Sequence, residues 1–179
     1  MKINPEHVRN REPRCPLILL LDTSGSMIGN PIQQLNQGLI TLQQEILESE
    51  KASDRVELAI VGFGESATLQ QPFVIASDFE PPTLTADGST PMGAGLTMAL
   101  DILKQELAEI KNSGIKCYRP WLVLITDGKP TDAWEASAER VRKEIDKGTV
   151  LLFVIAVEGA DMNILKQIAS PELPPAKLN

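Results

Sequence analysis

Short apolar runs alternate along the chain with longer segments in which apolar residues recur at every third or fourth position. The runs predict strands. Those at residues 15–21 and 121–125 are apolar on consecutive positions, as expected of strands that are buried on both faces. The predicted strands cover residues 15–21, 56–63, 67–75, 121–125 and 150–157.

The segments between these runs predict helices that each carry one apolar stripe. An Asn-Pro pair at position 30 and a Thr-Pro pair at position 90 have the composition of helix starts. Asp132 followed by Glu135 fits an N-cap and the third helical residue. A short helix is predicted over residues 161–169, before a proline-rich segment breaks it.

Strands that alternate with helices indicate an α/β fold with a doubly wound, mostly parallel central sheet and helices on both faces. We predict the strand order 3-2-1-4-5, with a short sixth strand as an option. The turn at residues 62–66 is short enough for a hairpin, so one edge strand is predicted to be antiparallel. Ligands bind such sheets at the carboxyl ends of the strands where the crossover direction reverses. This predicts a site just after Leu21 and just after Ile125.

Composition narrows the chemistry of that site. The 179 residues are near the size of one domain, and 17 Lys and Arg against 24 Asp and Glu give a formal charge of −7. Nucleic-acid binding needs a basic face, so no nucleic-acid partner is expected. His7 is the only histidine, and zinc-protease sites or Ser-His nucleophiles would depend on that one residue. A bound metal would therefore have oxygen ligands.

The cysteines and the N-terminus bear on the cellular location. Cys15 and Cys117 are too few for a disulfide framework and lack metal-ligand spacing. Residues 1–14 have no apolar run long enough for a signal peptide, and we expect a polar tail in which His7 has no functional role. The longest apolar stretch, residues 150–157, is far shorter than the roughly 20 residues of a membrane span. These features predict a cytoplasmic protein with reduced thiols and no membrane partner.

Three loops are expected to bring oxygen-bearing side chains to the predicted site. They cover residues 22–27, 87–93 and 126–132. Their carboxylates and hydroxyls suit a hard divalent cation, Mg²⁺ first, which takes six oxygen ligands at about 2.0–2.1 Å; Mn²⁺ and Ca²⁺ accept the same ligands. Serine and threonine hydroxyls are neutral, weak ligands, so a cation that they hold keeps its attraction for a further anion.

The residues of these loops resemble the metal-ion-dependent adhesion site of von Willebrand factor A domains. The pattern of that family is Asp-x-Ser-x-Ser, a distant Thr and a distant Asp, and it is matched by Asp22, Ser24, Ser26, Thr90 and Asp127. The resemblance covers residues 15–169 and implies a Rossmann-like fold. It implies that Ser24 and Ser26 bind the metal directly and that Thr90 binds directly or through water. Asp22 and Asp127 often act through water in that family, and an Asp or Glu carboxylate of a protein partner typically completes the shell.

The resemblance also sets expectations for the ends of the domain and for its relatives. Residues 15–179 are expected to form a single domain. Residues 173–179 leave room for a short strand at most, so the C-terminal helix of the family fold is missing from this sequence. Either the chain is truncated or a partner supplies that helix. The segment 127–132 and the compact build are similar to small bacterial proteins of the tellurium-resistance and stress-response group.

Several loop residues also have a plain structural interpretation. Thr90 fits an N-cap, Asp132 is a helix cap more often than a ligand, and Asp87 fits a turn. Gly25 and Gly88 fit positions where the backbone needs positive φ or close approach.

Three apolar residues flank the predicted site. Met27, Ile28 and Met92 would give a partner an apolar rim, although Met27 fits equally well beneath the loop.

Two functions compete for this arrangement. The first is a non-enzymatic binding module, in which a Mg²⁺-centred face captures an acidic side chain of a partner. The second is a metal-dependent, phosphatase-like hydrolase with Asp22 as nucleophile and Asp127 as metal ligand. The hydrolase needs a general acid where this chain has Ser24, and the sequence places no clear base, so we expect the binding module. A third reading is a scaffold that holds the metal only for stability.

Overall fold

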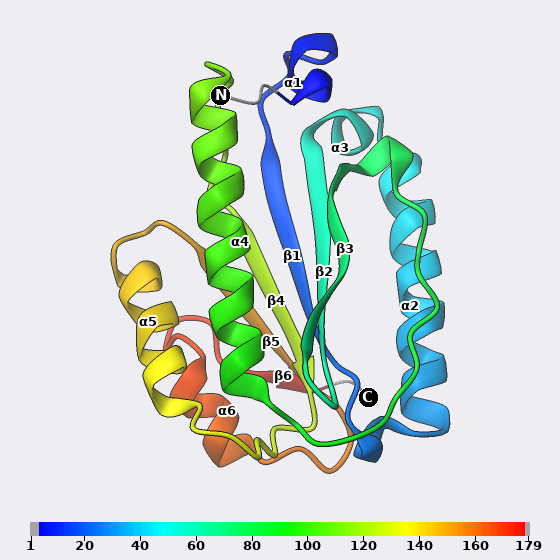
Figure 1. Cartoon of the computed structure of the whole chain (residues 1–179), viewed down its shortest axis with the longest axis vertical. Helices are drawn as coiled ribbons and strands as arrows, with labels where there is room; N and C mark the ends of the chain where they lie inside the picture. The colour runs from blue at the N-terminus through cyan, green and yellow to red at the C-terminus, as the bar shows by residue number, and fades with distance from the viewer. Residues whose placement is uncertain (1–3, 178–179) are drawn as a thin grey trace.

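A six-stranded sheet forms the centre of the structure, a computed structural model that describes residues 4–177. The strand order is β3-β2-β1-β4-β5-β6, and neighbouring strands are parallel except in the antiparallel pair β2 and β3 (Figure 1). The strands are β1 (Cys15–Asp22), β2 (Val56–Phe63), β3 (Ala67–Ile75), β4 (Trp121–Thr126), β5 (Leu151–Ala156) and β6 (Ala176–Lys177). The predicted fold class, strand order, edge hairpin and short sixth strand are confirmed.

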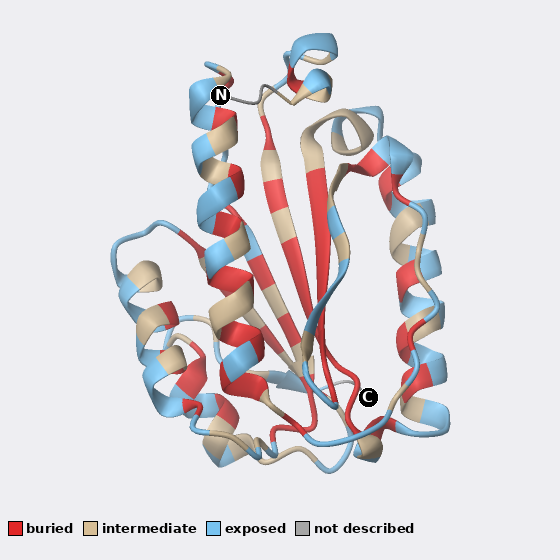
Figure 2. Cartoon of the chain, in the orientation of Figure 1, coloured by how far each residue is buried: buried red, intermediate tan, exposed pale blue. Residues whose placement is uncertain are grey.

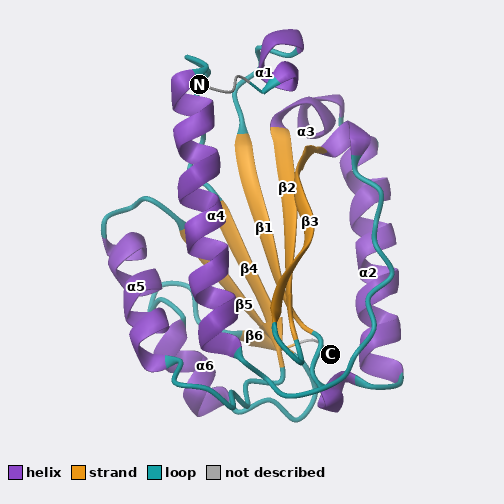
Figure 3. Cartoon of the chain, in the orientation of Figure 1, coloured by secondary structure: helices purple, strands orange, loops and turns teal. Residues whose placement is uncertain are grey.

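Helices lie on both faces of the sheet (Figure 3). Helix α2 packs on one face, and α4, α5 and α6 pack on the other. The helices are α1 (Pro5–Arg9), α2 (Asn30–Leu47), α3 (Glu50–Arg55), α4 (Met92–Asn112), α5 (Glu135–Asp146) and α6 (Met162–Ile168), with short 3₁₀ turns η1 (Gly25–Met27) and η2 (Ala76–Asp78). The sequence does not predict α3, because none of its residues is buried and it has no apolar stripe. Among residues 4–177, no helix combines the length and apolarity needed to cross a bilayer.

Side-chain burial differs between the centre of the sheet and the β4–β5 side (Figure 2). In β1 and β2 nearly every residue of the carboxyl half is buried, as predicted for strands covered on both faces. In β4 only alternate residues are buried. Leu122 and Leu124 pack with α4 and α5, whereas Val123 and Ile125 are half-buried and Trp121 is exposed. The apolar run of β4 therefore has a second face that the described residues cover incompletely.

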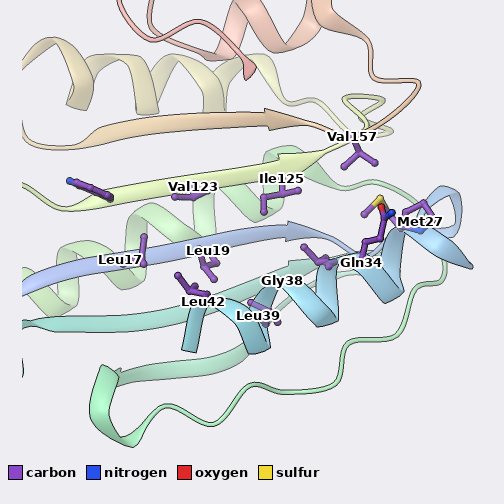
Figure 4. Close-up of a pocket in the computed structure, with 13 residues that line it drawn as sticks. Leu17, Leu19, Met27, Gln34, Gly38, Leu39, Leu42, Val123, Ile125 and Val157 are labelled. Carbon is purple, nitrogen blue, oxygen red and sulfur yellow. The ribbon is translucent and has the colours of Figure 1, made fainter. Parts of the chain in front are cut away.

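An apolar groove of about 520 Å³ lies over that half-covered face, between α2 and the sheet (Figure 4). Leu39 and Leu42 of α2 line one side, and Leu19, Val123 and Ile125 line the sheet side. The groove also reaches η1, so it adjoins the loop that follows β1.

Asp132 caps a different helix from the one predicted. Helix α5 begins at Glu135, and its N-cap Trp134 makes no side-chain cap bond. The two carboxylate oxygens of Asp132 instead accept hydrogen bonds from the backbone N–H groups of Gly93 (3.0 Å) and Ala94 (2.9 Å) at the start of α4. A carboxylate in this place satisfies otherwise unpaired donors and interacts favourably with the helix dipole. The bond ties the loop after β4 to the start of α4.

Residues 4–14 pack against the domain, where the sequence predicts a polar tail. His7 and Arg14 are fully buried. His7 Nε2 lies 2.8 Å and Arg14 Nε lies 2.9 Å from Oε1 of Glu57 in β2, and Glu106 of α4 is buried beside them. The prediction is wrong here because buried charged groups are tolerated when they find partners, and these partners are distant along the chain. We call His7, Arg14, Glu57 and Glu106 the N-terminal cluster.

The stability of the protein is expected to depend on pH through Glu106. Burial, and then the neighbouring Glu57 and Glu109 charges, raise the pKa of Glu106 to about 8, against a smaller lowering by Arg14. The folded state therefore holds this proton more tightly than the unfolded chain, where a glutamate pKa is about 4.3. For this group the free energy of unfolding is highest below about pH 4.3 and falls as pH rises to about 8, by up to about 1.4 kcal/mol per pH unit.

Urea unfolding at a series of pH values, in the presence of chelator, measures this slope. Glu106→Gln removes the titrating group and should flatten the decline between about pH 5 and 8. Glu45→Gln, at an exposed position of α2, should leave the decline unchanged. A decline of equal steepness in Glu106→Gln and the parent protein would assign the pH dependence to other groups.

Candidate metal site

Three loops meet at the carboxyl ends of β1 and β4, at the lower end of the molecule in Figure 1. The two strands are parallel neighbours, so Asp22 at the end of β1 and Asp127 just after β4 extend from the same edge of the sheet. The first loop follows β1, the second covers residues 87–91 and leads directly into α4, and the third follows β4. The polar residues of all three loops are therefore gathered where the strand order reverses.

Asp22 organises the first loop. Its Oδ1 atom accepts a hydrogen bond from the backbone N–H of Ser24 (2.9 Å), and this bond turns the chain sharply at the strand end. The hydroxyls of Ser24 and Ser26 then lie 3.0 Å apart. The structure therefore brings the Asp-x-Ser-x-Ser residues together in one turn. Asp22 and Ser24 are buried, and Ser26 is exposed and faces solvent.

Hydrogen bonds tie each loop to the other two. The backbone N–H of Gly25 donates to the carbonyl of Gly88 (3.1 Å), which joins the first and second loops. The second and third are joined by two bonds: Thr131 N–H donates to the carbonyl of Thr90 (2.9 Å), and Thr90 N–H donates to Oγ1 of Thr131 (3.0 Å). The ring closes where the Thr126 hydroxyl donates to Oδ2 of Asp22 (2.6 Å). The polar side chains thus stand on a rigid frame.

Thr90 and Asp127 make no hydrogen bond to Ser24 or Ser26 in the described structure; the bonds between the loops hold them near the serines. Thr90 is buried and held at both its N–H and its carbonyl by Thr131. Asp127 is buried, and its Oδ1 accepts a weak hydrogen bond from the N–H of Lys129 (3.3 Å) in its own loop. The carboxylate of Asp127 is close enough to Asp22 to affect its titration.

Electrostatics make the frame receptive to a cation. Burial, and to a smaller extent the neighbouring Asp127 charge, raise the pKa of Asp22, while hydrogen bonds from Ser24 and Thr126 oppose the rise. A positive ion beside these two carboxylates would stabilise the ionised form of Asp22, which the Asp127 charge disfavours. The donors are carboxylate and hydroxyl oxygens, so the residues fit a hard divalent cation and offer no soft ligand.

Two glycines are required by the close approach of these loops. Gly88 has φ +69°, and a Cβ atom there would lie 2.6 Å from Cα and 2.7 Å from N of Glu65. Gly64, after β2, has Thr23 O at 2.5 Å and Asp87 O at 2.9 Å from the position of its missing Cβ. Gly25 needs no positive φ, and its Cβ would meet Gly88 O at 3.2 Å. The sequence predicts positive φ or close approach of the backbone at both glycines. Gly88 has the positive φ, and Gly25 has the close approach, to the carbonyl of Gly88.

The apolar rim expected around the site is reduced to one residue. Met27 and Met92 are buried and belong to the core on opposite faces of the sheet, so neither offers a surface to a partner. Ile28 is 64% exposed. An isoleucine at the end of η1 is thus the apolar contact available beside Ser26.

Thr126 and Thr131 are structural members of the site that sequence reasoning did not single out. The Thr126 hydroxyl donates to Asp22 and accepts from the N–H of Gly128 (2.9 Å), so it fixes a carboxylate and a turn at once. Thr126 is the last residue of β4 and Thr131 lies in the loop that follows, where the sequence highlights only the aspartates. A threonine at a strand end carries no local signal for a partner 104 residues away.

Most of the chain matches a known protein family. Residues 17–175 match the von Willebrand factor type A domain. The heavy chain H4 of inter-alpha-trypsin inhibitor from Bos taurus is 27% identical over 140 residues, a match that covers 73% of this chain and 14% of that protein. The chain therefore spans a small part of the length of that relative.

Solved structures share the architecture. The pilus adhesin SpaC from Lactobacillus rhamnosus GG, in its open conformation, has a TM-score of 0.74 at 16% identity, covering 95% of this chain and 29% of that one. Manganese-loaded TRAP protein from Plasmodium vivax has a TM-score of 0.63 at 22% identity, covering 93% of this chain and 68% of that one. At these identities the similarity shows a shared fold. Because the family match extends over residues 17–175, the chain belongs to the von Willebrand factor type A domain family.

Proposed function

We propose that this domain is a metal-dependent protein-binding module that captures an Asp or Glu side chain of a partner protein. The observation that carries the proposal is the closed ring of hydrogen bonds around Asp22, which holds three loops of oxygen donors in one place. Domains of this family commonly mediate protein–protein interactions, and one structural relative is a pilus adhesin. Mg²⁺ is the proposed ion; a relative that was solved loaded with manganese supports Mn²⁺ as a substitute.

Each residue of the site would have its own role in holding the ion. Ser24 and Ser26 would hold the ion directly through their neutral hydroxyls, with Thr90 direct or through water. Asp22 is fully buried and accepts a hydrogen bond at each oxygen, which suits a role through bound water. Neutral hydroxyl ligands leave most of the positive charge uncompensated on the solvent side, where Ser26 is exposed. The ion supplies the attraction that a chain of charge −7 lacks for an acidic partner.

The same geometry disfavours the hydrolase reading. A carboxylate nucleophile needs an oxygen free to attack, whereas Oδ1 of Asp22 is held by Ser24 N–H and Oδ2 by the Thr126 hydroxyl. Ser24 also occupies the place where a general acid would be needed. We therefore propose a module without catalytic activity, in which the metal serves recognition rather than stability alone.

The biological system of the partner stays a prediction. The similarity of residues 127–132 to small bacterial proteins supports a partner in a stress-response or tellurium-resistance system. Identification of the captured partner tests this expectation together with the mechanism.

A pull-down from native cells, with the domain as bait, tests the proposed function. A partner should be captured in the presence of Mg²⁺, released by chelator, and recaptured when Mg²⁺ is restored. Replacement of acidic residues of the identified partner by their amides should abolish capture, because the partner carboxylate completes the metal shell.

Asp22→Ala bait serves as the negative control, and Asp87→Asn as the charge-matched control, since Asp87 is an exposed residue of the second loop. Capture that persists unchanged in chelator and in Asp22→Ala would show that another face of the domain binds the partner. Phosphatase activity of the parent protein that is lost in Asp22→Asn would support the hydrolase function instead.

A further inference from the structure

The N-terminal cluster lies at the end of the sheet opposite the three loops, beside α1 at the top of Figure 1. It joins α1, β2 and α4, three elements that are far apart in the sequence. Its side chains are buried: His7 and Arg14 fully, Glu57 at 2% exposure and Glu106 at 8%. The metal-binding face described above makes no use of them.

The hydrogen bonds of Ser113 fix a hydrogen on the Nδ1 side of His7. The Ser113 hydroxyl donates its single hydrogen to the carbonyl of Glu109 (2.9 Å), so at 3.1 Å from Nδ1 of His7 it must accept. Nδ1 therefore carries a hydrogen. Nε2 points at the carboxylates of Glu57 and Glu106, and it can bind a metal ion when it carries no hydrogen.

Three acceptors thus converge on one buried point. His7 Nε2 lies 2.8 Å from Oε1 of Glu57 and 3.8 Å from Oε1 of Glu106. Within the described structure, Glu57 Oε2 and Glu106 Oε1 are buried and have no hydrogen-bond partner. Buried carboxylate oxygens without donors are costly, so either the proton that Glu106 holds or a metal ion that displaces it would stabilise the arrangement.

We propose that His7, Glu57 and Glu106 form a second cation site, selective for Zn²⁺ and related transition metals over Mg²⁺. Each residue offers one ligand atom, and the three atoms lie within 4.8 Å of one another. Ligands at about 2.0–2.2 Å from a tetrahedral zinc ion are about 3.3–3.5 Å apart, and the 3.8 Å between Nε2 of His7 and Oε1 of Glu106 is close to that value. An imidazole nitrogen favours Zn²⁺, whereas the all-oxygen set at the other end of the sheet favours Mg²⁺.

The surroundings of these ligands match the proposal. The bond from Nδ1 to Ser113 fixes the ring of His7, as outer partners of metal-bound histidines commonly do. Arg14 Nε donates to Oε1 of Glu57 (2.9 Å) and leaves Oε2 free for a metal. Its charge offsets one carboxylate, so we expect weaker binding than at zinc sites built from thiolates.

An ion at this site would fasten the N-terminal segment to the domain. His7 belongs to α1, a helix of five residues, whereas Glu57 and Glu106 belong to a central strand and a long helix. Bound Zn²⁺ would hold residues 4–14 closed, and its removal would free them to open more often.

Zinc titration of the chelator-treated Asp22→Ala protein tests the site without interference from the adhesion residues. Calorimetry should show one equivalent of Zn²⁺ bound, with a raised thermal midpoint, and Co²⁺ should give the visible absorption of a four-coordinate site. On that background Glu106→Gln should weaken Zn²⁺ binding at least tenfold. Asp101→Asn, at an exposed position of the same helix, should leave binding unchanged.

Limited trypsin digestion gives an independent readout, because Arg9 and Arg11 are exposed in the segment that the metal would fasten. Zn²⁺ should slow cleavage after these residues in Asp22→Ala and leave it unchanged when Glu106→Gln is added. Absence of stoichiometric Zn²⁺ binding, or binding that survives Glu106→Gln, would overturn the proposal; the three acceptors then share a proton. Loss of Zn²⁺ binding in Cys117→Ser alone would place the ion at a thiol instead.

Discussion

In the Asp22→Asn variant, Mg²⁺ should no longer raise the thermal unfolding midpoint, although the protein remains folded in chelator. Asparagine has the shape of aspartate and can still accept the Ser24 N–H bond, but it removes one of the two buried carboxylates that would attract the ion. At a Mg²⁺ concentration of about 100 times Kd, the parent protein gains about 2.7 kcal/mol from the ion. The variant should gain close to none.

Thermal unfolding followed by circular dichroism, with chelator and with excess Mg²⁺, measures this difference. In chelator the midpoint of Asp22→Asn should lie near that of the parent, because relief of a buried charge offsets the imperfect amide contact with Thr126. Asp87→Asn makes the same charge change at an exposed loop position and should keep the Mg²⁺ effect. Equal Mg²⁺ gains in Asp22→Asn and the parent would remove Asp22 from the metal site.

Gly88→Ala should lower the free energy of unfolding by about 2–4 kcal/mol, since it adds a steric clash to a disfavoured conformation. At φ +69° an alanine is disfavoured, and its Cβ would meet backbone atoms of Glu65 at 2.6 and 2.7 Å. Backbone atoms have no rotamer by which to move away, so the second loop must shift. That shift would break the Gly25–Gly88 bond and loosen the frame around Asp22.

Gly114→Ala is the matched control for this experiment. Gly114 also has φ +69°, but no atom lies within 4 Å of the position of its missing Cβ. It should lose only the conformational cost, about 1–2 kcal/mol. Chemical denaturation of both variants separates the cost of the positive φ from the cost of the steric clash. Equal losses of unfolding free energy at the two positions would show that the loop at Gly88 relaxes freely.

The sheet could be predicted because its information is local. Consecutive apolar residues in β1 and β4 and the short turn at 62–66 specify strands, and the alternation with helices leaves few topologies. Helix α3 could not be predicted, because a helix without buried residues has no periodic pattern. The burial of the N-terminal segment could not be predicted for a related reason: the buried partners of its charged residues, Glu57 and Glu106, are distant along the chain.

The location of the candidate site could be predicted, but not the frame of hydrogen bonds around it, and metal binding by its residues stays a prediction. The spacing of Asp22, Ser24 and Ser26 is a local motif, and topology brings it to the edge of the sheet that Asp127 shares. The bonds made by Thr126 and Thr131 depend on how three loops approach one another in space. Asp132 shows the same limit: its sequence context is that of an N-cap, and the helix that it caps lies elsewhere in the chain.

The half-covered face of β4 gives the protein a built-in optical reporter. The chain has two tryptophans: Trp121 lines the apolar groove with 44% of its surface exposed, whereas Trp134 is 9% exposed in the core. Indole emission moves to shorter wavelength when water is removed from the ring, so a molecule that fills the groove would change the signal of Trp121 while the chain stays folded. Native-state fluorescence would therefore change on filling of the groove, and in a Trp121→Phe background Trp134 would report on the core alone.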